Sequence, residues 1–319
     1  MNWIKKKLFN SKLGNNIKEI FIKKFPSKEE QNESKYVSCH STPILKEDLE
    51  KNLWTCEKCG KNHRISPRYR FDNIIFGKSQ WTEIPAPVPK DDPLNFSDAK
   101  GSYSKRLKEA RANTKQDTAV LSAVGKINGI NVVSSAINFS YLGGSVGSGE
   151  GENILTAVQY AIDHRCPYLL FPASGGMRMM EGLISLSQMT RMTIAINELK
   201  KNKLLFLVCF VDPTSGGTTA SIASLSDIAI SEPGATIAFS GRRVIEGILK
   251  GSETLPPNFQ TAEWVKEKSG QIDIIVERKN LSKTIGTLLN ILLKKDSNVS
   301  SSSDENKTTK SNTTLTKAS

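Results

Sequence analysis

Apolar residues gather in two long runs near the middle of the chain. These runs, Thr118 to Gly125 and Ile130 to Asn138, are joined through Asn128-Gly129. An Asn-Gly pair is typical of a tight β-hairpin because both residues tolerate positive φ. The pattern therefore predicts an antiparallel hairpin at the start of the core.

Beyond this hairpin, the hydrophobic period changes repeatedly between that of a helix and that of a buried strand. Helices are predicted at about 152–163, from Gly176 to about Lys200, from about Gly217, and near 242–249, 260–268 and 280–294; strands are predicted at 168–172, 204–211, 228–231, 235–239 and 272–276. Such alternation implies a mainly parallel sheet with helices packed on its faces. The predicted fold is therefore α/β, preceded by a charged surface helix at 102–113.

Composition divides the chain into four parts. They are a basic N-terminal arm (1–35), a cysteine-containing module (36–66), a large core domain (67–294) and a tail rich in Ser, Thr, Asn and Lys (295–319). The tail has too little apolar surface to offset the entropy of ordering, so it is predicted to be disordered. The arm is interpreted as loosely ordered, and a transit peptide or a membrane-surface helix are the alternatives.

Charge and cysteine content limit the partners and the compartment. The chain has 319 residues and a formal net charge of +12. This charge suggests a polyanionic partner, and nucleic acid, an anionic membrane, an acidic protein and coenzyme A all stay open. No stretch reaches the roughly 18 apolar residues of a membrane-spanning helix, so no span is predicted. An odd number of cysteines and a start unlike a secretory signal predict a cytoplasmic protein.

Three glycine pairs follow apolar strands of the core. They are Gly143-Gly144, Gly175-Gly176 and Gly216-Gly217. A glycine pair lets the backbone approach a ligand closely and turn its N–H groups toward it, and a following helix favours negative charge. One such pair more often only relieves crowding. Three in similar positions favour a site for an oxyanion.

Side chains suited to other chemistry are scarce in the core. It contains one histidine, His164, and no pattern for serine, cysteine or metal hydrolysis. Cys166 and Cys209 lie among apolar residues and are interpreted as small buried hydrophobes. A reaction that creates an enolate from a thioester fits this inventory, because backbone N–H groups can stabilise the developing charge.

Four segments resemble one known family. They are Asn138 to Ser148, Phe171 to Met179, Asp212 to Gly217 and Phe239 to Glu246. Their order and spacing are similar to those of the beta subunit of acetyl-CoA carboxylase carboxyltransferase, and the likeness runs from about Leu45 to Leu293. The resemblance implies a crotonase-like spiral of β-sheets with packed helices, preceded by a small zinc-ribbon-like module.

The resemblance also implies a function and a set of partners. The chain would bind acetyl-CoA and stabilise its enolate, and the carboxyl group of carboxybiotin would pass to it to give malonyl-CoA for fatty acid synthesis. A carboxyltransferase alpha subunit would complete the site, in an α2β2 heterotetramer. Biotin carboxyl carrier protein and an ATP-dependent biotin carboxylase would supply carboxybiotin, since the chain has no Met-Lys-Met biotinylation motif and no glycine-rich nucleotide motif.

Site residues carry over from the family at matching positions. The resemblance assigns the oxyanion hole to the backbone of Gly175 and Gly176. Gly143 and Gly144 are added as opposing donors or a cofactor-contacting loop, and the further candidates for substrate binding are Arg178, Gly216, Gly217, Arg242 and Arg243. Alternatives stay open for several of these: Arg178 could instead bond a neighbouring loop, Gly216 and Gly217 could only permit tight packing, and the two neighbouring arginines could be solvated surface.

The cysteine module resembles half of a zinc ribbon. Cys56 and Cys59 have the Cys-x-x-Cys spacing of a zinc knuckle. The family's upstream pair would fall on Val37 and His40, whereas this sequence offers Cys39 and His40. A structural Zn²⁺ held by Cys39, Cys56, Cys59 and His40 is one prediction, and a module that folds without metal is the other.

Two other functions compete with carboxyl transfer. A zinc-ribbon nucleic-acid-binding protein would fit the basic charge, but the chain has few of the aromatic residues that stack bases. A coenzyme A hydratase or isomerase on the same fold would need carboxylates beside the thioester. Glu181 is the nearby acid, and it is expected to face a partner or solvent.

Overall fold

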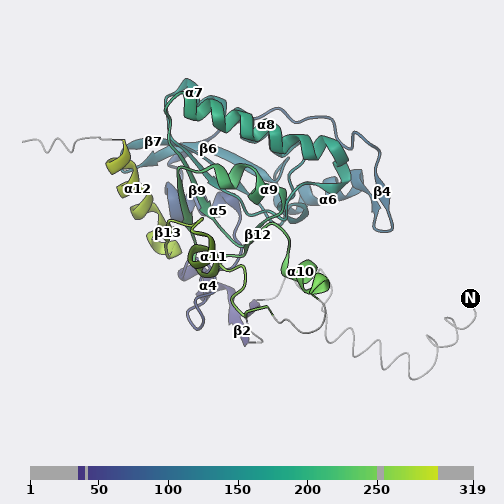
Figure 1. Cartoon of the computed structure of the whole chain (residues 1–319), viewed down its shortest axis with the longest axis horizontal. Helices are drawn as coiled ribbons and strands as arrows, with labels where there is room; N and C mark the ends of the chain where they lie inside the picture. Colours follow the sequence, from purple (N-terminus) through teal and green to yellow (C-terminus); the bar gives the residue numbers. More distant parts are fainter. Residues whose placement is uncertain (1–34, 40–41, 250–254, 294–319) are drawn as a thin grey trace, which may run out of the picture.

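A seven-stranded mixed sheet forms the centre of the molecule. The computed structural model describes residues 35–39, 42–249 and 255–293, so the predicted arm and tail lie outside the described residues except Lys35. The strands of the sheet are β3 (Trp81–Glu83), β6 (Val120–Ile127), β7 (Ile130–Ile137), β8 (Tyr168–Phe171), β9 (Phe206–Phe210), β11 (Ile228–Ser231) and β13 (Ile274–Ile275). Their spatial order is β13-β11-β9-β8-β7-β6-β3 (Figure 1). Strands β7 to β13 are parallel, while β6 and β3 extend the sheet antiparallel.

The predicted hairpin is confirmed. Strands β6 and β7 pair along their whole length, from Val120 opposite Ile137 to Ile127 opposite Ile130. Asn128 and Gly129 form the turn with φ of 49° and 76°. Positive φ at both residues gives the connection the twist that matches its strands.

Both faces of the sheet are covered, as predicted for an α/β fold. In β8, Tyr168 and Leu170 point into one core cluster, and Leu169 and Phe171 point into another. Helices α6 (Tyr103–Thr114), α7 (Ser148–Asp163) and α8 (Gly182–Lys201) cover the first face. The π-helical turn Phe71–Ile75 and α12 (Leu281–Leu292) cover the second, and Figure 1 shows α7 and α8 on the side opposite α12.

The long helix begins later than its pattern predicts. It was expected to begin at Gly176, but α8 begins at Gly182, where φ is 51°. The preceding segment pairs with the loop before α7, because Val146 and Met177 form a parallel bridge. A tertiary contact therefore outweighs local helix preference over these six residues.

The remaining elements are short. They are β1 (Tyr36–Cys39), β2 (Thr42–Leu45), α4 (Lys46–Lys51), α5 (Pro67–Arg70), β4 (Ser97–Asp98), β5 (Gly101–Ser102), β10 (Thr214–Ser215), α9 (Gly217–Ala220), β12 (Ile237–Ala238), α10 (Arg242–Ile248), α11 (Ala262–Ser269), and the 3₁₀ turns Leu142–Gly144, Met179–Glu181, Ile222–Leu225 and Arg278–Asn280. The strand predicted at 235–239 shrinks to β12, which pairs with β10 outside the main sheet. Within the ranges described, no helix combines the length and apolarity needed to cross a bilayer.

Candidate active site

The three glycine pairs lie side by side at the ends of neighbouring strands. The Gly175 N–H donates to the Gly143 carbonyl at 2.9 Å. The Ser174 N–H donates to the Pro213 carbonyl at 2.8 Å, and the Gly216 N–H to the Ala238 carbonyl at 3.0 Å. We call the three loops, residues 142–147, 173–178 and 213–217, the glycine platform. The structure thus brings together the residues that sequence spacing singled out.

Glycine is required in the platform because the loops almost touch. Gly144 has φ of 62°, and a Cβ there would collide with the Ala173 carbonyl oxygen. Gly176 has φ of 111°, and a Cβ there would lie 3.3 Å from the Gly216 Cα. Such φ values strain residues with a side chain. At these two positions the glycines allow both the turn and the close approach.

The N–H groups predicted to form the oxyanion hole already have partners within the platform. Besides the bond from Gly175 to Gly143, the Gly176 N–H donates to the Ser174 Oγ at 3.0 Å. Sequence reasoning missed the next residue, Met177, whose N–H has no hydrogen-bond partner among the described residues. It also missed Ser174, which is buried and whose hydroxyl lies 2.9 Å from the Thr218 Oγ1. The oxyanion hole at Gly175 and Gly176 stays a prediction, and in this structure both N–H groups are bonded within the platform.

Arg178, the last residue of the second platform loop, has a buried side chain. Its side chain is 3% exposed, and its Nη2 lies 2.7 Å from Glu150 Oε1 while Nη1 lies 3.4 Å from Glu181 Oε1. The same guanidinium donates to the Ser145 carbonyl at 2.5 Å. Burial opposes its charge, but Glu150 together with Tyr103 and Glu181 outweighs burial and raises the pKa of Arg178. The alternative in which Arg178 bonds a neighbouring loop is the one that the geometry favours.

Glu181 does not face solvent or a partner, contrary to expectation. It is 3% exposed, accepts the Tyr103 hydroxyl at 2.6 Å on Oε1, and accepts the Ser148 N–H at 2.6 Å on Oε2. A carboxylate so occupied is not presented to a thioester. The structure therefore gives no support to a hydratase in which Glu181 is the acid or base.

Arg242 and Arg243 begin α10 beside the third loop. Arg242 pairs with Glu246 at 2.7 Å and donates to the carbonyls of Leu255 and Pro256 at 2.9 Å. Its guanidinium thus fixes the following loop. Arg243 is more exposed than Arg242, whose side chain is partly covered by these contacts.

Large apolar side chains are exposed on both flanks of the platform. One group follows the Gly175-Gly176 loop and continues onto α8; the other starts at the strand end beside Gly216 and continues onto α10. We call them the apolar flanks: Met179, Leu183 and Leu186 on one side, Phe239, Val244 and Ile248 on the other. Exposed apolar groups around a candidate site are typical of a surface that a partner covers.

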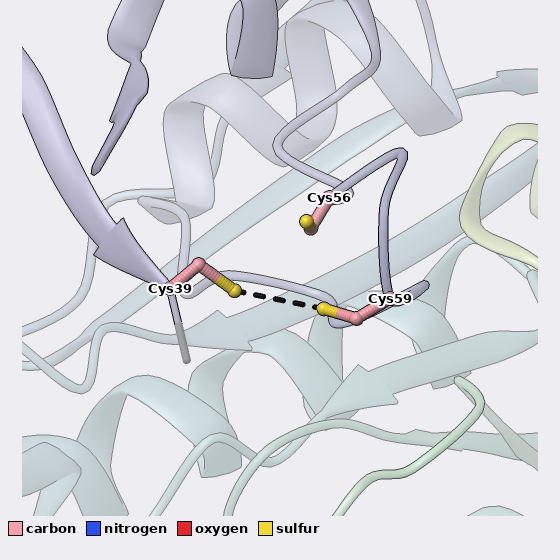
Figure 2. A group of neighbouring side chains, drawn as sticks. All are labelled: Cys39, Cys56 and Cys59. Carbon is pink, nitrogen blue, oxygen red and sulfur yellow. Dashed lines mark hydrogen bonds between the residues drawn. The ribbon is translucent and has the colours of Figure 1, made fainter. Parts of the chain in front are cut away.

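Three cysteines of the N-terminal module form a cluster (Figure 2). The sulfurs of Cys39, Cys56 and Cys59 lie within 4.8 Å of one another, and the Cys39 and Cys59 sulfurs are 3.6 Å apart. Tetrahedral zinc–thiolate bonds of about 2.3 Å place two sulfurs roughly 3.8 Å apart. The cluster therefore fits a zinc ion with three thiolates. His40, the predicted fourth ligand, lies outside the described residues.

The environment of the three thiols differs. Burial, with hydrogen bonds from the other two cysteines, raises the pKa of Cys39 to about 11. Burial also acts to raise the pKa of Cys56, but the backbone amides of Cys59 and Lys58 outweigh it and lower this pKa. Amides directed at the first sulfur of a Cys-x-x-Cys turn stabilise a thiolate ligand. None of the five cysteines forms a disulfide.

Buried arginines join the cysteine module to the core. Arg278 donates to the carbonyls of Leu53 and His63, at 2.9 and 3.0 Å, and pairs with Glu232 at 2.7 Å. Arg70 pairs with the same carboxylate at 2.7 Å. A hollow of about 630 Å³ lies between module and core, and Cys59, Arg64 and Asp212 are among its lining residues. No glycine of the platform lines it.

The comparison with known families places the chain in one class. Residues 92–318 match the model of the carboxyl transferase domain. This match spans most of the chain, and the chain belongs to the carboxyl transferase domain family.

Close relatives define the group within that class. The chain is 52% identical to the acetyl-coenzyme A carboxylase carboxyl transferase subunit beta of Pelagibacter ubique (strain HTCC1062), over all of this chain and 99% of the relative. It is 40% identical to the protein of the same name from Rhizobium meliloti (strain 1021), over 82% of this chain and 86% of the relative. The chain is thus a member of the family of acetyl-CoA carboxylase carboxyl transferase beta subunits, as the sequence motifs predict.

Solved structures of two other enzymes share the fold. Transcarboxylase 12S, with methylmalonyl-coenzyme A and methylmalonic acid bound, aligns with a TM-score of 0.57 at 24% identity, over 71% of this chain and 41% of that one. A Pseudomonas malonate decarboxylase hetero-tetramer in complex with malonate aligns with a TM-score of 0.54 at 18% identity, over 76% and 92%. The predicted α/β fold is confirmed at this level, and the nucleic-acid-binding alternative is not favoured.

Proposed function

We propose that this chain binds acetyl-CoA and stabilises its enolate while the carboxyl group of carboxybiotin is transferred to form malonyl-CoA. The observation that carries this proposal is the glycine platform, three backbone loops held within hydrogen-bond distance of one another. Its family membership supplies the reaction class.

This reaction requires the protein to stabilise a negative charge more than to supply an acid or a base. The methyl group of acetyl-CoA loses a proton, the enolate carbon bonds to the carboxyl carbon, and the thioester oxygen carries the negative charge in between. Carboxybiotin, delivered by a carrier protein, would supply the carboxyl group when its N–C bond breaks, and the biotin nitrogen freed in this way would take the proton. Donors aimed at such an oxygen are each worth about 2.7–4 kcal/mol of the barrier.

We place the oxygen-binding donors in the segment Gly175–Gly176–Met177. The Met177 N–H is available, and in this proposal the Gly176 N–H is released when the Ser174 side chain turns its Oγ away from it. The Gly175 N–H is held by Gly143, so in this proposal it fixes the loop rather than the substrate. Gly143, Gly144, Gly216 and Gly217 keep the neighbouring loops close enough to wall the site.

A second subunit is proposed to complete the site over the apolar flanks. One flank begins at Met179, three positions after Gly176. The other begins at Phe239, whose carbonyl lies 3.1 Å from the Gly216 N–H. A carboxyltransferase alpha subunit placed there would bury them and close the platform against water, which strengthens its dipoles. An α2β2 assembly, biotin carboxyl carrier protein and biotin carboxylase complete the proposed set of partners. Arg243 is an exposed cation near this face that could bind a phosphate or an acidic side chain.

The cysteine module is proposed to hold a structural zinc ion through Cys39, Cys56 and Cys59. Three converging sulfurs support this, and nothing in the module adds a general base beside an open metal position. The module at 36–66 is then a separate unit docked on the crotonase-like domain at 67–294 by Arg278 and Glu232.

The test is the reverse reaction, decarboxylation of malonyl-CoA with transfer to a biotin derivative, with the chain alone and with its alpha subunit. We expect activity only in the mixture. Gly176→Ala, which adds a Cβ 3.3 Å from Gly216, should lower kcat by about 10²-fold. Gly129→Ala also strains a positive φ but lies in open space, so it is the matched control. A well-folded complex without activity would overturn the proposal.

A further inference from the structure

A cluster of buried polar and charged side chains lies under the first two loops of the platform. Tyr103, Glu150, Arg178 and Glu181 are each at most 3% exposed, and they come from three different parts of the chain. They form one connected set: Arg178 joins the two carboxylates, and the Tyr103 hydroxyl both donates to Glu181 at 2.6 Å and accepts from Arg178 at 3.1 Å. Buried charges are costly in stability unless they are paired and hydrogen-bonded, and apolar residues at these positions would have avoided that cost.

Glu181, Glu150 and Arg178 each bond residues 145–148, and Glu150 also accepts the Ala119 N–H at 2.8 Å on Oε1. Glu181 Oε2 accepts the Ser148 N–H at 2.6 Å, and Glu150 Oε2 accepts the Gly147 N–H at 2.9 Å. Arg178 donates to the Ser145 carbonyl at 2.5 Å and to the Ser145 Oγ at 3.2 Å. Side chains that follow the Gly175-Gly176 pair therefore hold the loop that contains the Gly143-Gly144 pair.

Backbone bonds make this connection stiff. The Val146 N–H donates to the Gly176 carbonyl at 2.8 Å, and the Arg178 N–H donates to the Val146 carbonyl at 2.8 Å. A side chain at Gly147 would collide with the Glu181 carboxylate. The distance between the two glycine loops is thus set by the backbone hydrogen bonds at Val146 and by the side chains of the buried cluster.

We infer that Tyr103, Arg178 and Glu181 are positioning residues, which act on turnover by fixing the distance between the Gly143-Gly144 and Gly175-Gly176 loops. They do not touch substrate. This inference rests on the proposed function, because it assigns them an effect on carboxyl transfer. Misplacement of catalytic groups by about 1 Å can cost about 10²-fold in rate, whereas binding of the rest of the substrate changes little.

The kinetic test compares Tyr103→Phe and Glu181→Gln in the assembled carboxyltransferase. Both variants keep the volume of the side chain; the first removes the hydroxyl that bonds Glu181, and the second keeps an acceptor for Ser148. We expect kcat to fall by at least about 10-fold, with KM for malonyl-CoA within about 3-fold of the wild-type value. Glu152→Gln is the matched control, since Glu152 joins α7 to α8 through Arg191 at 2.8 Å but is outside the cluster.

A second readout follows the loops without any turnover. Hydrogen exchange of the amides at 143–148 and 174–178 should be faster in Tyr103→Phe than in the wild type and in Glu152→Gln. A wild-type kcat in both cluster variants, or a change in KM alone, would overturn the inference. If the wild-type complex itself lacks carboxyl transfer, the proposed function fails, and unchanged exchange in Tyr103→Phe would then overturn the positioning role as well.

Discussion

Gly144 is the residue at which the platform leaves the least room. Its Cβ position overlaps the Ala173 carbonyl oxygen, whereas the Cβ position of Gly129 has no atom within 4 Å, although both residues have positive φ. Gly129→Ala should therefore cost only the left-handed strain, about 1–2 kcal/mol, and Gly144→Ala should cost at least about 1 kcal/mol more. Urea unfolding of the two variants measures the difference. Equal losses would show that the two loops can separate freely.

Glu232 predicts how stability depends on acid. Burial acts to raise the pKa of its carboxyl, but Arg70 and Arg278 outweigh burial and lower the pKa from 4.5 to about 2. Because the folded pKa lies below the unfolded one, the pair stabilises the protein above about pH 4.5, and this contribution is lost as the pH falls toward 2.

The Glu232→Gln variant should lose about 3 kcal/mol or more at pH 7, since two buried arginines lose their partner. Its free energy of unfolding should also change less between pH 5 and pH 3 than that of the wild type, which denaturant titration at each pH measures. Glu198→Gln, which removes an exposed ion pair with Lys201, should stay within about 0.5 kcal/mol of the wild type. Parallel curves for wild type and Glu232→Gln would contradict the assignment.

At the scale of elements, the cysteine module should depend on metal. The purified chain should contain close to one zinc per molecule, and Cys59→Ser should lose it, because two thiolates hold zinc far less well than three. Elemental analysis after dialysis measures the content. Cys166→Ser, at a buried cysteine outside the cluster, should keep the metal. Full occupancy in Cys59→Ser would remove this residue from the ligand set.

The sequence correctly predicted the elements that depend only on residues within one segment. The hairpin at Asn128-Gly129 and the helix at 103–114 were found because their turn residues and periodicity lie within one segment. The start of α8 was wrong, because the bridge between Val146 and Met177 joins segments about thirty residues apart in sequence. Hydrophobic periodicity within one segment carries no information about such pairing.

The sequence predicted the glycine pairs of the candidate site but not the burial of Glu181. Glycine pairs at strand ends are visible in sequence, and the three loops do meet. The burial of Glu181 was not visible, because its partner Tyr103 lies 78 positions earlier. The N–H of Met177, the donor proposed above, was missed because a backbone N–H leaves no mark in the choice of side chain.

For the molecule as a whole, the apolar flanks predict how assembly fails. Leu183 is 81% exposed, so Leu183→Glu should leave the fold and its thermal unfolding unchanged but weaken association with the proposed alpha subunit by at least about 10-fold. Sedimentation of mixtures at known concentrations measures this. Ile291→Glu, at an exposed position on α12, is the control and should assemble normally. Normal assembly of Leu183→Glu would place the partner elsewhere.

The backbone bonds of the platform also constrain when the site can exist. Gly143 is bonded to Gly175, Ser174 to Pro213, and Gly216 to Ala238, and the Ile237 N–H in turn donates to the Gln260 carbonyl at 2.8 Å. Each of these bonds needs both partners, and the last partner, Gln260, lies later in the chain than strand β9. During synthesis, the strands β6 to β9 can pair while the chain is still growing on the ribosome. The third loop of the platform bonds Ala238, whose neighbour Ile237 bonds Gln260, so a chain that ends before Gln260 can have strands β3 to β9 paired without the complete site.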